Sequence, residues 1–124
     1  MLSLKHQQRY FLLSGLEKLD CSGCGVLNIT PGALQPLNQT LKELDVSRNQ
    51  YLTFDDINNA LQGLENCTIL QNLFVNHIHI QYERSVELTK EDMRFILTMK
   101  NLTNLYMDLN NIDIIDPEVL FSHF

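Results

Sequence analysis

The sequence has 124 residues but no tryptophan, only three cysteines and no long apolar run. Its longest unbroken apolar stretch, residues 10–13, is far shorter than the ~20 residues of a membrane-spanning helix, so we expect no such helix. Residues 1–15 carry Lys5, His6 and Arg9 where a secretory signal would be apolar, and we expect no signal peptide there. Three cysteines also do not make a disulfide framework.

Basic residues are scarce as well. Nine lysines and arginines stand against 15 acidic residues, which gives a net charge of −6 and a pI near 5.0. This balance disfavours a phosphate-binding surface, so we expect no nucleic acid partner for this segment. With 44% hydrophobic and 19% charged residues, the composition is that of an ordinary folded domain, and the length fits one domain over residues 1–124.

Leucine, by contrast, is abundant, with 22 positions that fall in a regular pattern. The spacing L-x-x-L-x-L-x-x-N/C-x-L occurs four times, with starts at residues 16, 41, 70 and 102. The matching positions are Leu16, Leu19, Cys21, Cys24 and Val26; Leu41, Leu44, Val46, Asn49 and Tyr51; Leu70, Leu73, Val75, Ile78 and Ile80; and Leu102, Leu105, Met107, Asn110 and Ile112. This is the leucine-rich-repeat signature.

The repeat predicts an α/β fold, a leucine-rich-repeat solenoid shaped as a horseshoe arc. A parallel β-sheet would line the concave side, with short helices and loops on the convex side, because a single repeat cannot bury its leucines alone. Asn49 and Asn110 occupy positions where an inward amide bonds the backbone of the turn, and Cys24 is a familiar substitute there. Ile78 has no such group, so we expect an irregularity in the third repeat.

The segments between the predicted strands carry helix-start signals. Thr30-Pro31 and Asp116-Pro117 place a capping side chain before proline, and residues 53–56 and 89–92 place acids after a capping threonine. Apolar residues then follow at helical spacing. They are Ile57, Leu61 and Leu64 after Thr53, and Met93, Ile96 and Leu97 after Thr89. The long third repeat predicts an excursion over residues 81–100 with a helix of two or more turns.

Four motifs give the chain a resemblance to a known family. They are LEKLDCSGC from residue 16, ITPGAL from residue 29, LKELDVSRN from residue 41 and LTNLYMDLNNI from residue 102. With the irregular repeat lengths, residues 10–124 resemble an internal or N-terminal-half fragment of a Toll-like receptor ectodomain.

The resemblance implies a non-catalytic, ligand-binding or dimerising part of an innate-immune pattern-recognition receptor. Its partner would be a microbial ligand or a second receptor chain. The segment would lie on the extracellular or endosomal-lumenal side of a single-pass receptor, attached to the membrane only through other parts of the receptor. The alternative is a general extracellular leucine-rich-repeat scaffold for adhesion or interaction.

Outward positions of the strands provide candidate binding residues. In successive repeats, the position between the second and third core residues is Asp20, Asp45, Phe74 and Tyr106. Exposed aromatic neighbours can anchor a partner, although they can also be a cross-strand pair that stabilises the sheet. Together with residues of the next outward columns, they give a candidate ligand- or partner-binding set of Phe74, Asn76, His77, Tyr106 and Asp108.

Catalytic, metal and cofactor motifs are weak. Cys21 and Cys24 form a CxxC, but three extended steps separate them by roughly 10 Å, so we expect core cysteines rather than a disulfide or zinc site. Cys67 is either a semi-buried thiol or the partner of a cysteine outside the segment. His77 and His79 could bind a metal or sense pH, yet they are more simply a surface pair. We expect no enzyme activity and no cofactor.

The chain carries no recognisable terminal caps, so we interpret it as a fragment of a longer receptor. Uncapped repeat ends expose apolar faces and strand edges, and we expect the isolated fragment to self-associate.

Four N-x-T sequons, at Asn28, Asn38, Asn66 and Asn101, exceed the number expected by chance and favour a secreted protein, although the repeat itself generates N-L-T easily. Asn38, Asn66 and Asn101 precede predicted strands. We predict that glycans on these residues cover the flank leading into the strands and leave the opposite flank free. Mass spectrometry of the secreted protein measures their occupancy, and unmodified Asn38, Asn66 and Asn101 would contradict the prediction.

Overall fold

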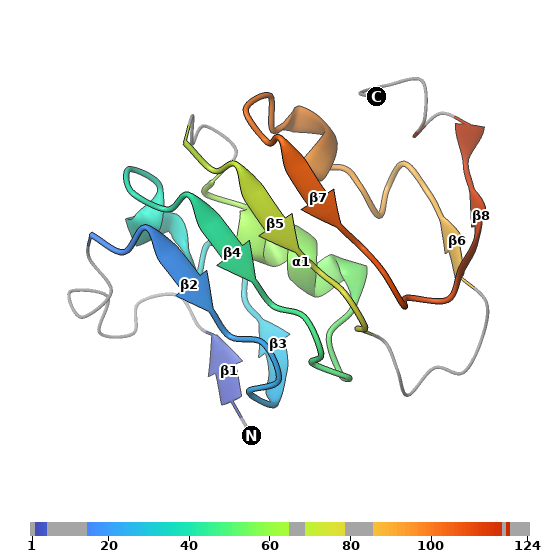
Figure 1. The fold of residues 1–124 in the computed structure, drawn as a ribbon, viewed down its shortest axis with the longest axis horizontal. Coiled ribbons are helices and arrows are strands. Elements are labelled where there is room, and N and C mark those ends of the chain that lie inside the picture. Colours follow the sequence, from blue (N-terminus) through green and yellow to red (C-terminus); the bar gives the residue numbers. More distant parts are fainter. Residues whose placement is uncertain (1, 5–14, 65–68, 79–85, 118, 120–124) are drawn as a thin grey trace.

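The computed structural model describes residues 2–4, 15–64, 69–78, 86–117 and 119. Its centre is a parallel four-stranded sheet in the order β2-β4-β5-β7 (Figure 1). The strands are β2 Lys18–Asp20, β4 Glu43–Asp45, β5 Asn72–Phe74 and β7 Asn104–Tyr106. Leu19, Leu44, Leu73 and Leu105 are register partners across it. The predicted side-by-side packing of these strands is confirmed, and the α/β fold is compatible with a leucine-rich-repeat-like architecture.

Two smaller parallel pairs lie away from this sheet. β1 Leu2–Leu4 pairs with β3 Val26–Ile29, and β6 Val86–Leu88 pairs with β8 Ile112–Ile115. Each pair has one register irregularity, where β3 and β8 carry an extra residue opposite their partner. The leucine pattern did not predict these pairs, because their strands lie outside the L-x-L positions.

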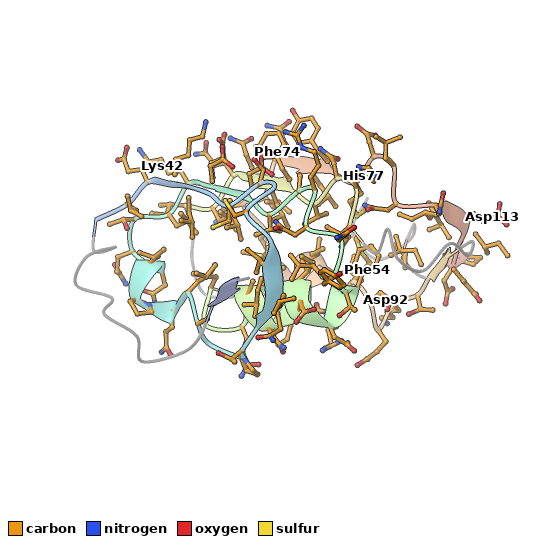
Figure 2. The ribbon with its side chains drawn as sticks, turned by 90° about the horizontal axis from the view of Figure 1, so that it is seen from below. Lys42, Phe54, Phe74, His77, Asp92 and Asp113 are labelled. Carbon is orange, nitrogen blue, oxygen red and sulfur yellow. The ribbon has the colours of Figure 1, made fainter. Side chains whose placement is uncertain are left out.

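The core lies between the four-stranded sheet and helix α1 Phe54–Leu61 (Figure 2). Leu44 and Leu73 of the central strands are fully buried, whereas Leu19 and Leu105 are only half-buried. The difference follows from position, because β2 and β7 have a strand neighbour on one side only within the described residues. Each fully buried leucine contributes about 1.5–3 kcal/mol relative to an exposed one.

Helix α1 begins where its capping residues predict. Thr53 Oγ1 accepts the backbone N–H of Asp56, and an Asp56 carboxylate oxygen accepts the backbone N–H of Thr53, which is a capping box. Asp55 and Asp56 in the first turn also complement the helix dipole. The predicted helix after Thr53 is therefore confirmed, with its apolar face, including Ile57 and Leu61, in the core.

The prediction of a helix of two or more turns after Thr89 is wrong. Thr89 and Asp92 form the same reciprocal hydrogen bonds, but turns follow, and then a short 3-10 helix over Ile96–Thr98. The buried Asn58 of α1 accounts for the difference: its Nδ2 donates to the carbonyl of Asp92 at 2.9 Å, and its Oδ1 accepts the N–H of Phe95 at 3.2 Å. Both backbone groups would otherwise take part in α-helical bonds.

A helix starting at Pro31 is likewise not present. Residues 31–34 form turns, and a 3-10 helix spans Gln35–Leu37. Pro36 explains this outcome, since it lacks a backbone N–H and disfavours the helical conformation of the residue before it. At the other proline signal, residues 117 and 119 are helical.

The inward amides bond the turns as predicted. Asn49 Nδ2 donates to the carbonyls of Cys21 and Val46, while its Oδ1 accepts the N–H of Val26. Asn110 makes the matching bonds to Val75, Met107 and Ile78. Ile78 itself is buried. The expected irregularity after it falls on residues 79–85, outside the described residues.

None of the helices within the described segments has the length and apolar character required to cross a bilayer. The longest apolar stretch of the sequence, residues 10–13, lies outside the described residues.

We predict that Asn49→Ala lowers the free energy of unfolding by about 2–4 kcal/mol, because it leaves buried backbone groups of two repeats without partners. Asn104→Ala is the matched control, since Asn104 is an exposed asparagine on the last strand of the described sheet and its loss costs less than about 1 kcal/mol. Urea titration followed by circular dichroism measures both variants. Equal destabilisation would contradict the role assigned to the buried amide.

Candidate functional site

The sheet face opposite α1, here called the outward face, carries three rows of side chains across the strands. The first row is a continuous polar ladder. Lys18 Nζ lies 2.9 Å from a Glu43 carboxylate oxygen, Asn72 Nδ2 donates to Glu43 at 3.5 Å, and Asn104 Nδ2 donates to Asn72 at 2.7 Å. The hydrogen bond and ion pair with Glu43 raise the pKa of Lys18. The ladder satisfies its own members, so this row supplies few free groups to a partner.

The second row ends in two stacked aromatic rings. Phe74 and Tyr106 are register partners, their ring centroids lie 4.4 Å apart and their planes differ by 5°. Tyr106 remains 41% exposed. The structure thus contains the cross-strand pair proposed as the alternative to a partner anchor, and it also leaves aromatic surface accessible.

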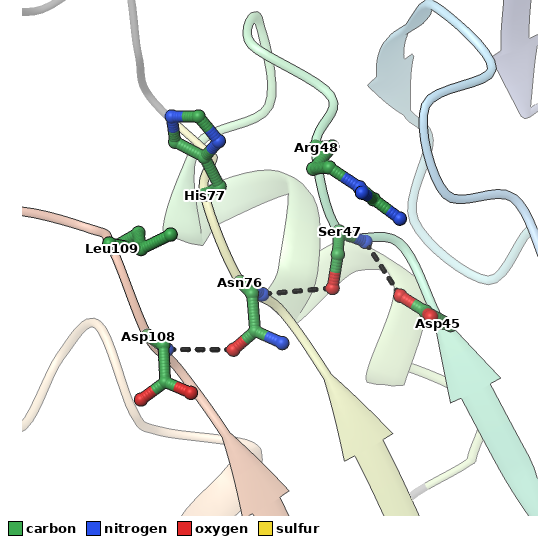
Figure 3. A pocket seen from close by; sticks show the side chains of 7 residues that line it. All are labelled: Asp45, Ser47, Arg48, Asn76, His77, Asp108 and Leu109. Carbon is green, nitrogen blue, oxygen red and sulfur yellow. Dashed lines mark hydrogen bonds between the residues drawn. The ribbon is translucent and has the colours of Figure 1, made fainter.

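The third row contains Ser47, Asn76 and Asp108, and hydrogen bonds from backbone N–H groups to side-chain oxygens fix it (Figure 3). Ser47 Oγ accepts the N–H of Asn76 at 3.0 Å, and Asn76 Oδ1 accepts the N–H of Asp108 at 2.7 Å. Asp45 Oδ1 accepts the N–H of Ser47 at 2.9 Å. In the first repeat, Asp20 Oδ1 accepts the N–H of Ser22 in the same way, and this bond holds the pKa of Asp20 below its usual value. These bonds hold the side chains in defined positions.

A shallow depression of about 250 Å³ opens beside this row (Figure 3). It is lined by Asp45, Ser47, Arg48, Asn76, His77, Asp108 and Leu109. Three predicted site residues, Asn76, His77 and Asp108, line it together, while Phe74 and Tyr106 stand one row away on the same strands. The predicted set omitted the other four lining residues, although their places in the repeat columns mark them as outward.

The turn residues of the depression share an unusual backbone. Arg48, His77 and Leu109 have φ values of 56°, 55° and 61°, and the equivalent residue in the first repeat is Gly23 at 62°. A left-handed conformation costs a non-glycine residue roughly 1–2 kcal/mol. Three bulky side chains are thus held at the rim of the depression at some cost in stability, and Leu109 is 75% exposed.

Polar groups in the depression remain available to a partner. In the part of the chain that the structure describes, the side chains of Arg48, His77 and Asp108 make no hydrogen bond or short ion pair. No group of three or more His, Cys, Asp or Glu residues among those described is arranged to hold a metal. His79, the other member of the predicted histidine pair, lies outside the described residues.

The two cysteines of the CxxC differ in environment. Both are free thiols, with Cys21 buried and Cys24 exposed. Burial raises the pKa of the Cys21 thiol to about 11. The Cys24 thiol faces the carbonyl of Ser22 at 3.6 Å. Cys67 lies outside the described residues.

The sequons also differ in exposure. Asn28 and Asn101 are exposed, Asn38 is half-buried, and Asn66 lies outside the described residues. Within the described part of the chain, the buried Thr40 hydroxyl of the second sequon has no hydrogen-bond partner.

Comparison with known proteins gives one informative match. The chain is 28% identical over 106 residues to a protein named Toll-like receptor 4 from Pinctada imbricata. The match covers 86% of this chain and only 12% of that protein's length. No family model matches the chain, and no solved structure matches it. The similarity is thus to a short stretch of a Toll-like receptor.

We predict that iodoacetamide at pH 8 alkylates Cys24 far faster than Cys21. The thiolate is the reactive form, and Cys21 is buried and its thiol has a raised pKa. The raised pKa also makes the folded state lose stability as the pH rises from 9 towards 11, where the unfolded chain ionises first. Peptide mass mapping over time measures the two rates. Equal labelling of the folded chain would contradict the prediction.

Proposed function

We propose that the chain is a segment of the ectodomain of a Toll-like innate-immune receptor, and that it binds a microbial ligand or a second receptor chain without catalysis. The repeats would continue as a leucine-rich-repeat solenoid, with the four-stranded sheet on the concave side. The segment would face the cell exterior or the endosomal lumen and carry glycans on its accessible sequons.

The single observation that supports this most is the register of the sheet. Four leucines from repeats 25 to 32 residues apart sit side by side, and buried asparagines hold the turns between them. A scaffold of this kind grows by repetition and presents one side chain per repeat in each outward row. The similarity to part of a Toll-like receptor supports the receptor class.

The outward face supports the binding role. Phe74 and Tyr106 offer rigid aromatic area, and Asn76, His77 and Asp108 line the adjacent depression. Rigid rings beside fixed polar groups are typical of protein recognition surfaces, because little side-chain entropy is lost on binding.

We predict that replacing both rings, Phe74→Ala with Tyr106→Ala, reduces the response of the full-length receptor by about tenfold or more. The measurement is reporter-gene output in cells expressing the receptor and exposed to heat-killed bacteria, normalised to surface expression. Tyr51→Ala is the control, since Tyr51 is an exposed aromatic away from the stack.

An unchanged response at normal surface expression would overturn the proposed role of this face. The general adhesion scaffold would instead be favoured by two results together. The unaltered receptor would give no response to bacteria, and the double variant would lose cell–cell adhesion.

A further inference from the structure

Two aspartates neighbour the aromatic pair, one across the sheet and one along the chain. Asp45 on β4 is the register partner of Phe74, so it stands one strand spacing, about 4.8 Å, from that position. Asp108 lies two residues beyond Tyr106 on the same chain, and its N–H bond to Asn76 keeps it beside the sheet. Asp108 is in the turn directly after β7, and only Met107 separates it from Tyr106. A cation over the Tyr106 ring is therefore within reach of the Asp108 carboxylate.

The charge of the outward face favours a cation there. Lys18 is neutralised by Glu43, which leaves Asp20, Asp45 and Asp108 against Arg48. The outward positions of β5, of β7 and of the two residues after each strand carry no lysine or arginine. They are Asn72, Phe74, Asn76, Asn104, Tyr106 and Asp108. An incoming ammonium or guanidinium group meets carboxylates and aromatic rings at this end of the sheet, while an anion meets repulsion.

Leu109 adds an apolar contact for the stem of such a side chain. It is 75% exposed at the rim of the depression, held outward by its left-handed backbone. Arginine and lysine cover apolar surface with their methylenes while the charged end reaches a polar group. Leu109 and Asp108 together offer both parts of that contact.

We propose that this end of the outward face binds arginine or lysine side chains of a protein partner, so that the partner presents a basic segment. The proposal rests on the proposed function, because it names the chemistry of the partner for the same face. The guanidinium or ammonium group lies against Tyr106 and pairs with Asp108.

The test is isothermal titration of the full chain with an acetylated and amidated peptide, Gly-Arg-Gly-Arg-Gly-Arg-Gly, at low salt. A matched peptide with citrulline at every arginine keeps the shape and removes the charge. We expect the arginine peptide to bind at least tenfold more tightly than the citrulline peptide, and its affinity to fall as sodium chloride is added.

The variants Asp108→Asn and Tyr106→Ala are each expected to weaken binding about three- to fivefold. Asp108→Asn preserves shape and backbone bonds, so it separates loss of charge from loss of fold. Asp113→Asn is the matched control, since Asp113 is an exposed carboxylate on β8, away from the stack. We expect Asp113→Asn to bind like the unaltered chain.

Equal affinity for the arginine and citrulline peptides, or unchanged binding by Asp108→Asn, would overturn the proposal. Binding of maltopentaose that competes with the arginine peptide for Tyr106 would also overturn it, in favour of a saccharide. The cell response tests the proposed function through the two rings, whereas the comparison of the arginine and citrulline peptides tests only the partner's charge. The two failures are therefore distinguishable.

Discussion

A buried side-chain amide that bonds the backbone of two successive repeats is the interaction on which this structure depends. Asn49 bonds the turn of the first repeat through Cys21 and Val26, and Asn110 bonds that of the third through Val75 and Ile78. Parallel strands leave the polar groups of such turns inside the protein, where an unpaired group costs about 1–3 kcal/mol. The amide removes that cost and fixes where each turn leaves the sheet.

The fixed turns determine the outward face. Once the turn is set, the residue before the amide position adopts a left-handed backbone, as Gly23, Arg48, His77 and Leu109 all do. In the third and fourth repeats, that conformation places His77 and Leu109 at the rim of the depression beside the aromatic stack. The stacking of the core and the shape of the candidate site thus have a common origin.

Sequence predicted those features that repeat with a fixed period or depend on near neighbours. The sheet followed from L-x-L spacing, and α1 followed from the four residues of its capping box. The segment after Thr89 carries the same signal, but Asn58, which lies 34 residues from Asp92, takes its helical hydrogen bonds. The depression was predicted only in part for a related reason, because arginine and leucine give no local sign of a left-handed backbone.

Outward side chains join successive repeats whether or not the buried amide is present. Between the second and third repeats, where Ile78 stands in place of asparagine, Ser47 Oγ accepts the N–H of Asn76. Asn76 Oδ1 in turn accepts the N–H of Asp108. These two polar side chains therefore act chiefly in holding strands together. The groups that remain for contact with a partner are the aromatic rings, the Asp108 carboxylate and the exposed turn residues.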